Sequence, residues 1–178
     1  MKKYKVGIIG YGGFGRFLHH WWEKLDEVEV VAISDSKTDF DTLPNCTGYR
    51  HWEDLVQSPD IDIVSVVTPP SVHAEIAIAA MQAGKHVLLE KPVAVSMEQA
   101  EQILAARDQT GKAIMVDHML RYSPLVKQMQ ALSLSGRFGK LRHAEVANYA
   151  QDAATCRTLV LEQRFFWRDF HRTWCAFY

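Results

Sequence analysis

Three glycines near the N-terminus have the spacing of a phosphate-binding turn. Residues 10–15 read Gly-Tyr-Gly-Gly-Phe-Gly, a G-x-G-x-x-G pattern. In such a turn the first glycine, Gly10, permits a tight bend, and the second, Gly12, lets a pyrophosphate approach the backbone. The third, Gly15, lets the following helix pack closely against the preceding strand. These spacings predict a dinucleotide site, and a glycine turn kept for packing alone is the alternative.

The segments that flank the glycines suit a strand before them and a helix after them. Residues 4–9 form a short, apolar, β-branched run, which is typical of a buried parallel strand. We interpret Trp21 and Trp22 as residues that pack the helix, not as part of a cofactor site. The start of the helix, around Gly13 and Phe14, would offer unpaired N–H groups and a positive dipole end to the phosphates. Six apolar residues after the turn recur at helical spacing: Phe14, Phe17, Leu18, Trp21, Trp22 and Leu25.

An acidic residue about 20 positions after the glycines makes the pattern more specific. Residues 28–33 are apolar enough for a second strand, and Ser34-Asp35 closes it. Asp35 can accept hydrogen bonds from both hydroxyls of an adenosine ribose. Its charge disfavours a 2′-phosphate, although Ser36 and Lys37 could partly offset that repulsion. We therefore expect NAD or NADP as cofactor, with NAD slightly preferred.

Three further strands are predicted, and each is followed by polar or charged residues. They cover residues 61–67, 86–89 and 113–116. Because the carboxyl ends of parallel strands share one edge of a sheet, where ligands bind, we expect the residues that follow the strands to converge on one crevice. In chain order these are Gly10–Gly15, Asp35, Thr68-Pro69, Glu90-Lys91 and His118.

Helical segments separate these strands. Ser71 is a plausible N-cap for a helix that ends at Gly84. Ser96 and Gln99 fit a capping box for a second helix, which ends at Gly111. We expect this helix to turn three residues toward the core: Ala100, Ile103 and Leu104. Strands that alternate with helices on short connections predict an α/β protein with a doubly wound parallel sheet, the Rossmann arrangement.

Composition narrows the class of protein. The chain has 178 residues, with 20 Lys and Arg against 21 Asp and Glu, and no basic stripe, so we expect no nucleic-acid partner. The three cysteines Cys46, Cys156 and Cys175 are widely spaced, which favours free thiols and no metal site. No apolar run is long enough for a membrane span. We therefore expect a cytoplasmic protein with no membrane association.

Two longer stretches are distinctive. Residues 68–75 read Thr-Pro-Pro-Ser-Val-His-Ala-Glu, and residues 83–92 read Ala-Gly-Lys-His-Val-Leu-Leu-Glu-Lys-Pro. Together they resemble the Gfo/Idh/MocA oxidoreductases, a family that includes glucose–fructose oxidoreductase and inositol dehydrogenases. Residues 121–124, Arg-Tyr-Ser-Pro, are similar to the family's Arg-Phe-x-Pro entry into a second domain. The resemblance extends from the start of the chain to about Tyr149.

The resemblance implies a site and a reaction. The reaction would be hydride transfer between a nicotinamide and a sugar, polyol or related hydroxy compound, with Lys91 as the catalytic residue at the substrate oxygen. The simpler interpretations are a solvated lysine at Lys91, a salt bridge at Glu90 and a helix-surface histidine at His73. A cis Lys91–Pro92 bond is a further hypothesis. The cofactor would contact Gly10–Gly15, Asp35, Ser36, Thr68, Pro69, His73, Glu90 and Lys91.

The C-terminal part departs from the family. We expect residues 1–120 to form the NAD(P)-binding domain and residues 121–178 to form only the start of a truncated α+β substrate and dimerisation domain. Residues 124–134 are predicted as a helix and residues 140–149 as a strand, and the aromatic residues of 165–178 would lack cover. We therefore expect a homo-oligomer or a mobile tail. The alternative function is a non-catalytic dinucleotide-binding remnant or redox sensor.

Overall fold

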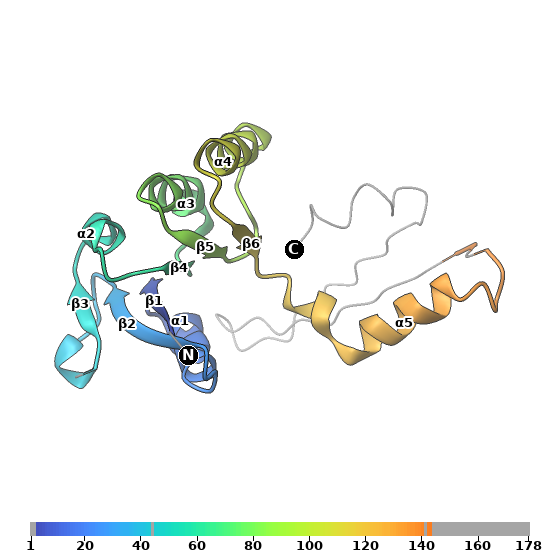
Figure 1. Ribbon diagram of the computed structural model, residues 1–178, viewed down its shortest axis with the longest axis horizontal. Coiled ribbons are helices and arrows are strands. Elements are labelled where there is room, and N and C mark those ends of the chain that lie inside the picture. Colours follow the sequence, from blue (N-terminus) through green and yellow to red (C-terminus); the bar gives the residue numbers. More distant parts are fainter. Residues whose placement is uncertain (1–2, 44, 141, 144–178) are drawn as a thin grey trace, which may run out of the picture. The chain divides into compact units, whose positions relative to one another are not determined.

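The computed structural model describes residues 3–43, 45–140 and 142–143. The chain divides into two compact units, Met1–His118 and Met119–Tyr178. In the first unit a six-stranded parallel sheet has the strand order β3-β2-β1-β4-β5-β6, which confirms the predicted α/β fold (Figure 1). The strands are β1 (Tyr4–Ile9), β2 (Val28–Ser34), β3 (Thr47–Tyr49), β4 (Ile63–Val66), β5 (His86–Leu89) and β6 (Ile114–Val116).

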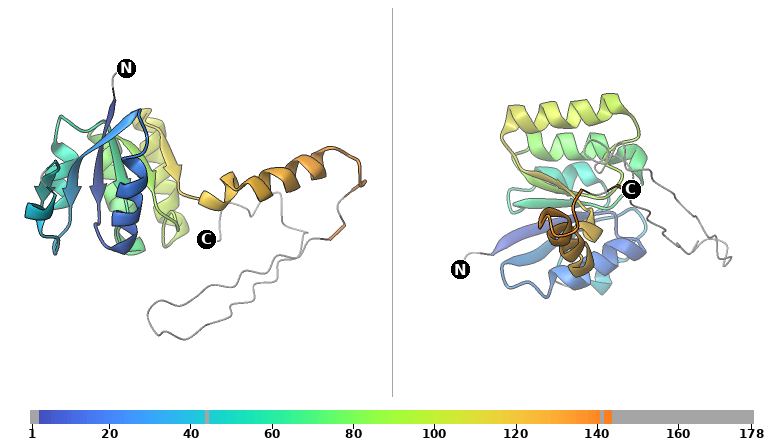
Figure 2. Two further views of the ribbon diagram at one scale, coloured as in Figure 1. Left: turned by 90° about the horizontal axis from the view of Figure 1, so that it is seen from below. Right: turned by 90° about the vertical axis from the view of Figure 1, so that its right-hand side faces the viewer.

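Helices cover both faces of this sheet. Helix α1 (Gly13–Trp22) lies on one face, and α2 (Trp52–Gln57), α3 (His73–Gln82) and α4 (Met97–Thr110) lie on the other, as Figures 1 and 2 show. The order of the strands reverses at β1, where the chain crosses from β3 over α2 to β4. Such a reversal opens a crevice at the carboxyl ends of the neighbouring strands.

The larger core fills the space between the sheet and helices α2–α4. Small buried residues of α3, among them Ala77 and Ala80, let this helix approach both the sheet and α4. Leu55, Met81 and Ile103 are almost fully buried around them. Burial of each such side chain stabilises the fold by roughly 1.5–3 kcal/mol, so this packing fixes β4 and β5, the strands that carry the residues of the predicted crevice.

Helix α4 has the predicted ends. The Ser96 hydroxyl accepts a hydrogen bond from the Gln99 amide at 3.2 Å, and the Gln99 side chain accepts one from the Val95 amide at 3.2 Å. Gly111 ends the helix with φ of 65°. The predicted inward position of Ile103 is confirmed, but that of Leu104 is wrong, since its side chain is 47% exposed. Leu104 lies about 100° around the helix from Ile103 and therefore faces solvent.

One local prediction is wrong, and one short strand was not predicted. Ser71 does not cap α3, because Pro70–Val72 form a 3-10 turn and the helix begins at His73 after Val72. The segment before Gly48 contains the 3-10 turn Phe40–Thr42, and residues 47–49 form edge strand β3, which we did not predict. Three residues are too few to show the alternation that marks a strand.

Helix α1 presents its apolar residues differently from the prediction. Gly15 and His19 are the buried residues of the helix, and Trp22 packs against the smaller core beside β1 and β2. Trp21 was interpreted as packing, but it is 51% exposed. Because the close approach at Gly15 turns positions 15, 19 and 22 toward the sheet, the aromatic face lies outside. The exposed aromatic residues are Phe14, Phe17 and Trp21.

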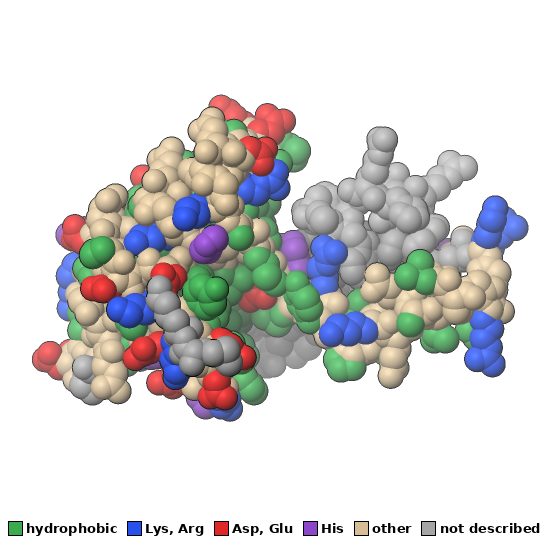
Figure 3. All heavy atoms as spheres, in the orientation of Figure 1, with side chains coloured by type: hydrophobic (Ala, Val, Ile, Leu, Met, Phe, Trp, Pro, Cys, Tyr) green, Lys and Arg blue, Asp and Glu red, His purple; other side chains and the backbone are tan. Residues whose placement is uncertain are grey.

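The second unit begins with the 3-10 turn Met119–Tyr122, and helix α5 covers Pro124–Leu134, as predicted. The predicted strand over 140–149 and the aromatic residues of 165–178 lie outside the described residues. On the face of the first unit seen in Figure 3, Lys and Arg side chains are interspersed with Asp and Glu. Within the described part of the chain, no helix is long and apolar enough to cross a membrane.

Candidate functional site

The glycine turn between β1 and α1 requires glycine at two of its positions. Gly10 has φ of 92°, and a Cβ added there would lie 2.6 Å from the carbonyl oxygen of Val67. A Cβ at Gly15 would collide with the carbonyl oxygen of Gly10. The first and third glycines of the motif therefore serve the close packing of the turn against β4 and α1.

The middle of the turn is open instead. A Cβ added at Gly12 or at Gly13 would meet no atom within 4 Å. Helix α1 begins here with Gly12 as its N-cap residue and with no side-chain cap. The first N–H groups of a helix have no partners within the helix, and they carry the positive end of its dipole. An uncovered backbone with free donors fits the pyrophosphate of a dinucleotide.

Asp35, at the end of β2, is hydrogen-bonded to two backbone segments. Its Oδ2 accepts from the Tyr11 amide at 3.0 Å, which joins β2 to the glycine turn. Its Oδ1 accepts from the amides of Lys37 and Thr38 at 2.8 and 2.9 Å, and from the Thr38 hydroxyl at 3.1 Å. Burial alone would raise the pKa of Asp35, but these hydrogen bonds outweigh it and lower the pKa. The carboxylate is therefore kept charged and fixed beside the turn.

Arg50 supports the loop that follows Asp35. Its Nη1 atom donates to the carbonyl oxygens of Ser36 and Thr38 at 3.2 and 2.9 Å, and its guanidinium lies over the ring of Phe40. The side chain of Ser36 is exposed at this loop. No motif in the sequence points to Arg50, because its role depends on edge strand β3, whose end places it beside the loop.

His73 connects the segments that follow β4 and β5. The ring is fully buried, with Nδ1 2.8 Å from the carbonyl oxygen of Pro92 and Nε2 2.9 Å from that of Thr68. A carbonyl oxygen only accepts, so the ring donates through the nitrogen that carries the proton. Of the residues beside it, Thr68 is half-buried and Pro69 is exposed. This geometry gives His73 the role of holding two loops at the crevice together.

Glu90 and Lys91 follow β5 and differ in exposure. Glu90 is 8% exposed, and its Oε2 accepts from the Lys91 amide at 3.0 Å. The Lys91 side chain is exposed, and the Lys91–Pro92 peptide bond is cis, as predicted. Burial, together with a hydrogen bond to Asp117 and the charge of Asp117, raises the pKa of Glu90 to about 7, against the opposing effect of Lys91.

The other lysine of the same motif is structural. Lys85 precedes β5, is 7% exposed, and its Nζ donates to the carbonyl oxygen of Ser58 at 2.6 Å. Burial lowers its pKa. Lys85 therefore joins the start of β5 to the end of α2, at the opposite edge of the sheet from Lys91.

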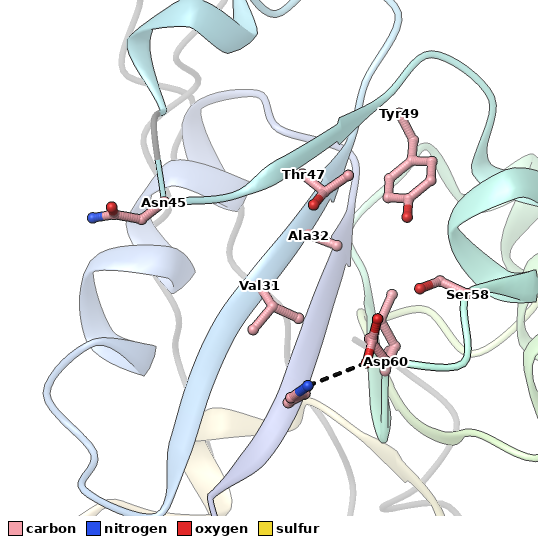
Figure 4. Close-up of a pocket in the computed structure, with 9 residues that line it drawn as sticks. Val31, Ala32, Asn45, Thr47, Tyr49, Ser58 and Asp60 are labelled. Carbon is pink, nitrogen blue, oxygen red and sulfur yellow. Dashed lines mark hydrogen bonds and ion pairs between the residues drawn. The ribbon is translucent and has the colours of Figure 1, made fainter.

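A hollow also opens near the amino ends of the strands (Figure 4). Lys5 and Asp60, which both line it, form an ion pair with 3.3 Å between Nζ and Oδ1. Its volume is about 280 Å³, and none of the predicted site residues lines it. The predicted crevice is therefore separate from this hollow. The lining residues are Lys5, Val31, Ala32, Asn45, Thr47, Tyr49, Ser58, Asp60 and Ile61.

The predicted residues after β1, β2, β4 and β5 are thus connected at the carboxyl edge of the sheet. Tyr11 contacts Asp35, Gly10 lies against the end of β4, and His73 spans Thr68 and Pro92. After β6, His118 is half-buried and its amide donates to the Val116 carbonyl. Asp117, which we did not single out as a ligand residue, lies beside Glu90. Among the described residues, no cluster of His, Cys, Asp and Glu could hold a metal ion.

Comparison with known proteins gives this geometry a context. The sequence is 31% identical over 153 residues to 1-carboxy-3-chloro-3,4-dihydroxycyclohexa-1,5-diene dehydrogenase of Comamonas testosteroni, covering 82% of this chain and 38% of that protein. It is 36% identical over 121 residues to the scyllo-inositol 2-dehydrogenase (NADP(+)) IolW of Bacillus subtilis, covering 66% of this chain and 34% of the relative. The crystal structure of myo-inositol 2-dehydrogenase from Lactobacillus plantarum superposes with a TM-score of 0.72 at 25% identity, over 79% of this chain and 43% of that one.

The chain therefore spans less than half the length of these three proteins. The family described as an oxidoreductase family with an NAD-binding Rossmann fold matches residues 4–118, which is nearly the whole first unit. With the glycine turn, the acid at the end of β2 and the Glu-Lys-Pro segment after β5 all on one edge of the sheet, the chain belongs to the Gfo/Idh/MocA oxidoreductase family.

Proposed function

We propose that this protein transfers hydride between a nicotinamide dinucleotide and a sugar, polyol or related hydroxy compound. The observation that carries the proposal is the position of Lys91. It follows β5, which is separated from β1 and the glycine turn only by β4. Neighbouring strands are about 4.8 Å apart, so the two sites are about 10 Å apart across the sheet. A dinucleotide with its pyrophosphate at Gly12 can reach that far.

Residues that follow different strands would contact different parts of the dinucleotide. The turn at Gly12 and Gly13 would hold the pyrophosphate, Asp35 would face the adenosine ribose, and Thr68, Pro69 and Glu90 would line the path to the nicotinamide. Phe14 and Ser36 would border the pyrophosphate and the ribose. Through its contacts with the carbonyl oxygens of Thr68 and Pro92, His73 would position Thr68 and the Glu90-Lys91-Pro92 segment. When bound, the dinucleotide supplies the hydride acceptor or donor.

Lys91 would handle the proton of the substrate oxygen. As hydride leaves the carbinol carbon, the neutral amine of Lys91 takes the hydroxyl proton, and a carbonyl forms. In the opposite direction its ammonium polarises the carbonyl and donates the proton to the oxygen. Such general acid–base assistance contributes about 10²–10⁴-fold in rate. The Lys91 side chain is exposed, and within the described part of the chain no hydrogen bond or ion pair holds it away from a substrate.

The choice between NAD and NADP depends on the loop after β2. The charge of Asp35 disfavours a 2′-phosphate, which supports NAD. The guanidinium of Arg50 contacts this loop and Lys37 is one of its exposed residues, so their positive charges would favour a phosphate. IolW, one of the relatives, is named for NADP(+). We propose NAD as the slightly preferred cofactor.

Calorimetric titration with NADH and NADPH tests the cofactor assignment, and the ratio of the two Kd values gives the preference. Turnover is then screened with inositols, aldoses and hydroxy acids, with Lys91→Met as the inactive control. Binding with Lys91-dependent turnover is expected. Binding without turnover of any compound would favour the alternative, a non-catalytic dinucleotide-binding protein or redox sensor. A folded protein that binds neither dinucleotide would contradict both functions.

A further inference from the structure

Two carboxyl groups lie side by side where β5 and β6 end. Leu89 of β5 pairs with Val116 of β6, so the next residues, Glu90 and Asp117, are abreast. The Asp117 amide donates to the Leu89 carbonyl at 2.8 Å. The Glu90 amide donates to the Val66 carbonyl of β4 at 3.0 Å. The backbone therefore holds Glu90 between its two neighbouring strands.

The hydrogen bonds of Glu90 are incomplete when both carboxyls are charged. Oε2 accepts from the Lys91 amide, but Oε1 is buried and no donor among the described residues reaches it. The Asp117 side chain is within hydrogen-bond distance of Glu90. Two carboxylates cannot donate to each other, whereas one proton between them makes an O–H···O⁻ bond, which is among the strong classes of hydrogen bond.

The other ionisable groups around the pair do not replace this proton. The Lys91 charge acts on Glu90, but the hydrogen bond between the two residues comes from the Lys91 backbone. From α3, the ring of His73 is directed at two backbone carbonyls and not at the carboxyls. His118 follows Asp117 and is half-buried. Burial and the proximity of Asp117 raise the pKa of Glu90 to about 7.

We propose that Glu90 and Asp117 share one proton and that this acid pair makes the binding of the oxidised cofactor release a proton. The inference deepens the proposed function and rests on it. The nicotinamide ring carries a positive charge when oxidised and none when reduced. A pair that has lost its proton carries two negative charges and attracts the oxidised ring more strongly than a singly charged pair does.

When the oxidised form binds, its positive ring lowers the affinity of the pair for the shared proton, and part of that proton, less than one per complex, passes to solvent. In the reduced case the ring is neutral, and the proton stays on the pair. Between pH 6 and pH 8.5 the affinity for the oxidised form should therefore rise by roughly 3- to 10-fold, as expected for one charge pair in a partly solvated site. The affinity for the reduced form should stay within about twofold.

The first experiment needs no ligand. Side-chain carboxyl resonances of the full chain are followed by NMR from pH 4 to pH 9. We expect one carboxyl to titrate near pH 7, and Asp117→Asn to move it below pH 6, because the amide can donate to Glu90 without carrying charge. Glu101→Gln, an exposed change on α4, should leave that titration in place. Absence of any carboxyl that titrates between pH 6 and pH 8 would overturn the shared proton.

The second experiment measures the coupling. Calorimetry with NAD⁺ and NADH, or with NADP⁺ and NADPH if those bind instead, is run between pH 6 and pH 8.5. Each titration is repeated in two buffers of different ionisation enthalpy. Wild type should release protons on binding the oxidised form, and Asp117→Asn should not. A pH-independent affinity for the oxidised form would overturn the coupling even if the carboxyl titrates near pH 7. Failure to bind either form would overturn the proposed function and the coupling together, while the NMR titration would still decide whether the proton is shared.

Discussion

The Tyr11 hydroxyl and Nδ1 of His19 are hydrogen-bonded inside the first unit, and this bond joins the glycine turn to the middle of α1. Tyr11 is 5% exposed and His19 is 9% exposed, although one lies in a loop and the other on a helix. Burial raises the pKa of Tyr11 and lowers that of His19. The imidazole is therefore neutral, and because its Nε2 faces the Glu23 carboxylate at 3.7 Å, the ring proton is assigned to Nε2 and Nδ1 accepts from the hydroxyl. Neither residue was expected to support the phosphate-binding turn.

Removal of that hydroxyl should destabilise the fold. In Tyr11→Phe the buried Nδ1 of His19 loses its donor, which should lower the free energy of unfolding by about 1–2 kcal/mol. The matched control is Tyr4→Phe, because Tyr4 is 56% exposed and should change by less than about 0.5 kcal/mol. Urea denaturation at pH 7 measures both. Equal stability of the two variants would contradict a structural role for the Tyr11–His19 bond.

His19 should also make stability depend on pH. Since its folded pKa lies below the usual value, the unfolded chain binds more protons than the folded one between the folded pKa and about pH 6.5. Stability contributed by His19 is therefore present above about pH 6.5 and falls as the pH drops below it. The difference in unfolding free energy between wild type and His19→Gln, measured from pH 5 to pH 7.5, isolates this contribution from that of Glu90. His20→Gln, at an exposed position, is the control. A wild-type-minus-variant difference that does not change with pH would argue that His19 titrates as in the unfolded chain.

The glycines of the turn should separate into two classes. Gly10→Ala and Gly15→Ala introduce side chains where backbone oxygens lie, so we expect losses of about 2 kcal/mol or more in folding stability. Gly12 has φ of −70°, and open space surrounds its Cβ position. Gly12→Ala should therefore fold as well as wild type but bind NADH at least about tenfold more weakly, because the methyl group occupies the place of the pyrophosphate. Thermal unfolding and calorimetry measure the two effects. Wild-type affinity in Gly12→Ala would place the pyrophosphate elsewhere.

The two lysines of the Gly-Lys-His-Val-Leu-Leu-Glu-Lys-Pro stretch should give opposite results. Lys85→Met leaves the Ser58 carbonyl without its donor and should lower stability by about 1–3 kcal/mol, with cofactor affinity unchanged. Lys91→Met should leave stability within about 0.5 kcal/mol and lower turnover by about 10²–10⁴-fold. Each variant is the control for the other. Loss of stability in Lys91→Met, without loss of turnover beyond the unfolded fraction, would show that Lys91 is a structural residue.

Much of the fold follows from short stretches of sequence. The glycine turn at residues 10–15 lies directly between a strand and a helix, so its local pattern predicts both elements and their connection. Gly84 and Gly111, which end α3 and α4, have φ of 81° and 65°. The carboxyl-edge positions of Asp35, Thr68 and Glu90 follow from the parallel sheet, because every parallel strand ends at the same edge.

The tertiary structure decided what those residues contact. Sequence periodicity identified the apolar face of α1, but the close approach at Gly15 turned His19 inward and left Trp21 outside. The carboxylate of Asp35 accepts a hydrogen bond from the backbone amide of Tyr11, 24 positions earlier in the sequence. Glu90 lies beside Asp117 only because β5 and β6 pair in register. Local sequence determines which secondary structure a segment forms. The burial of a side chain and the sharing of a proton depend on groups that are distant in sequence and that strand pairing brings together.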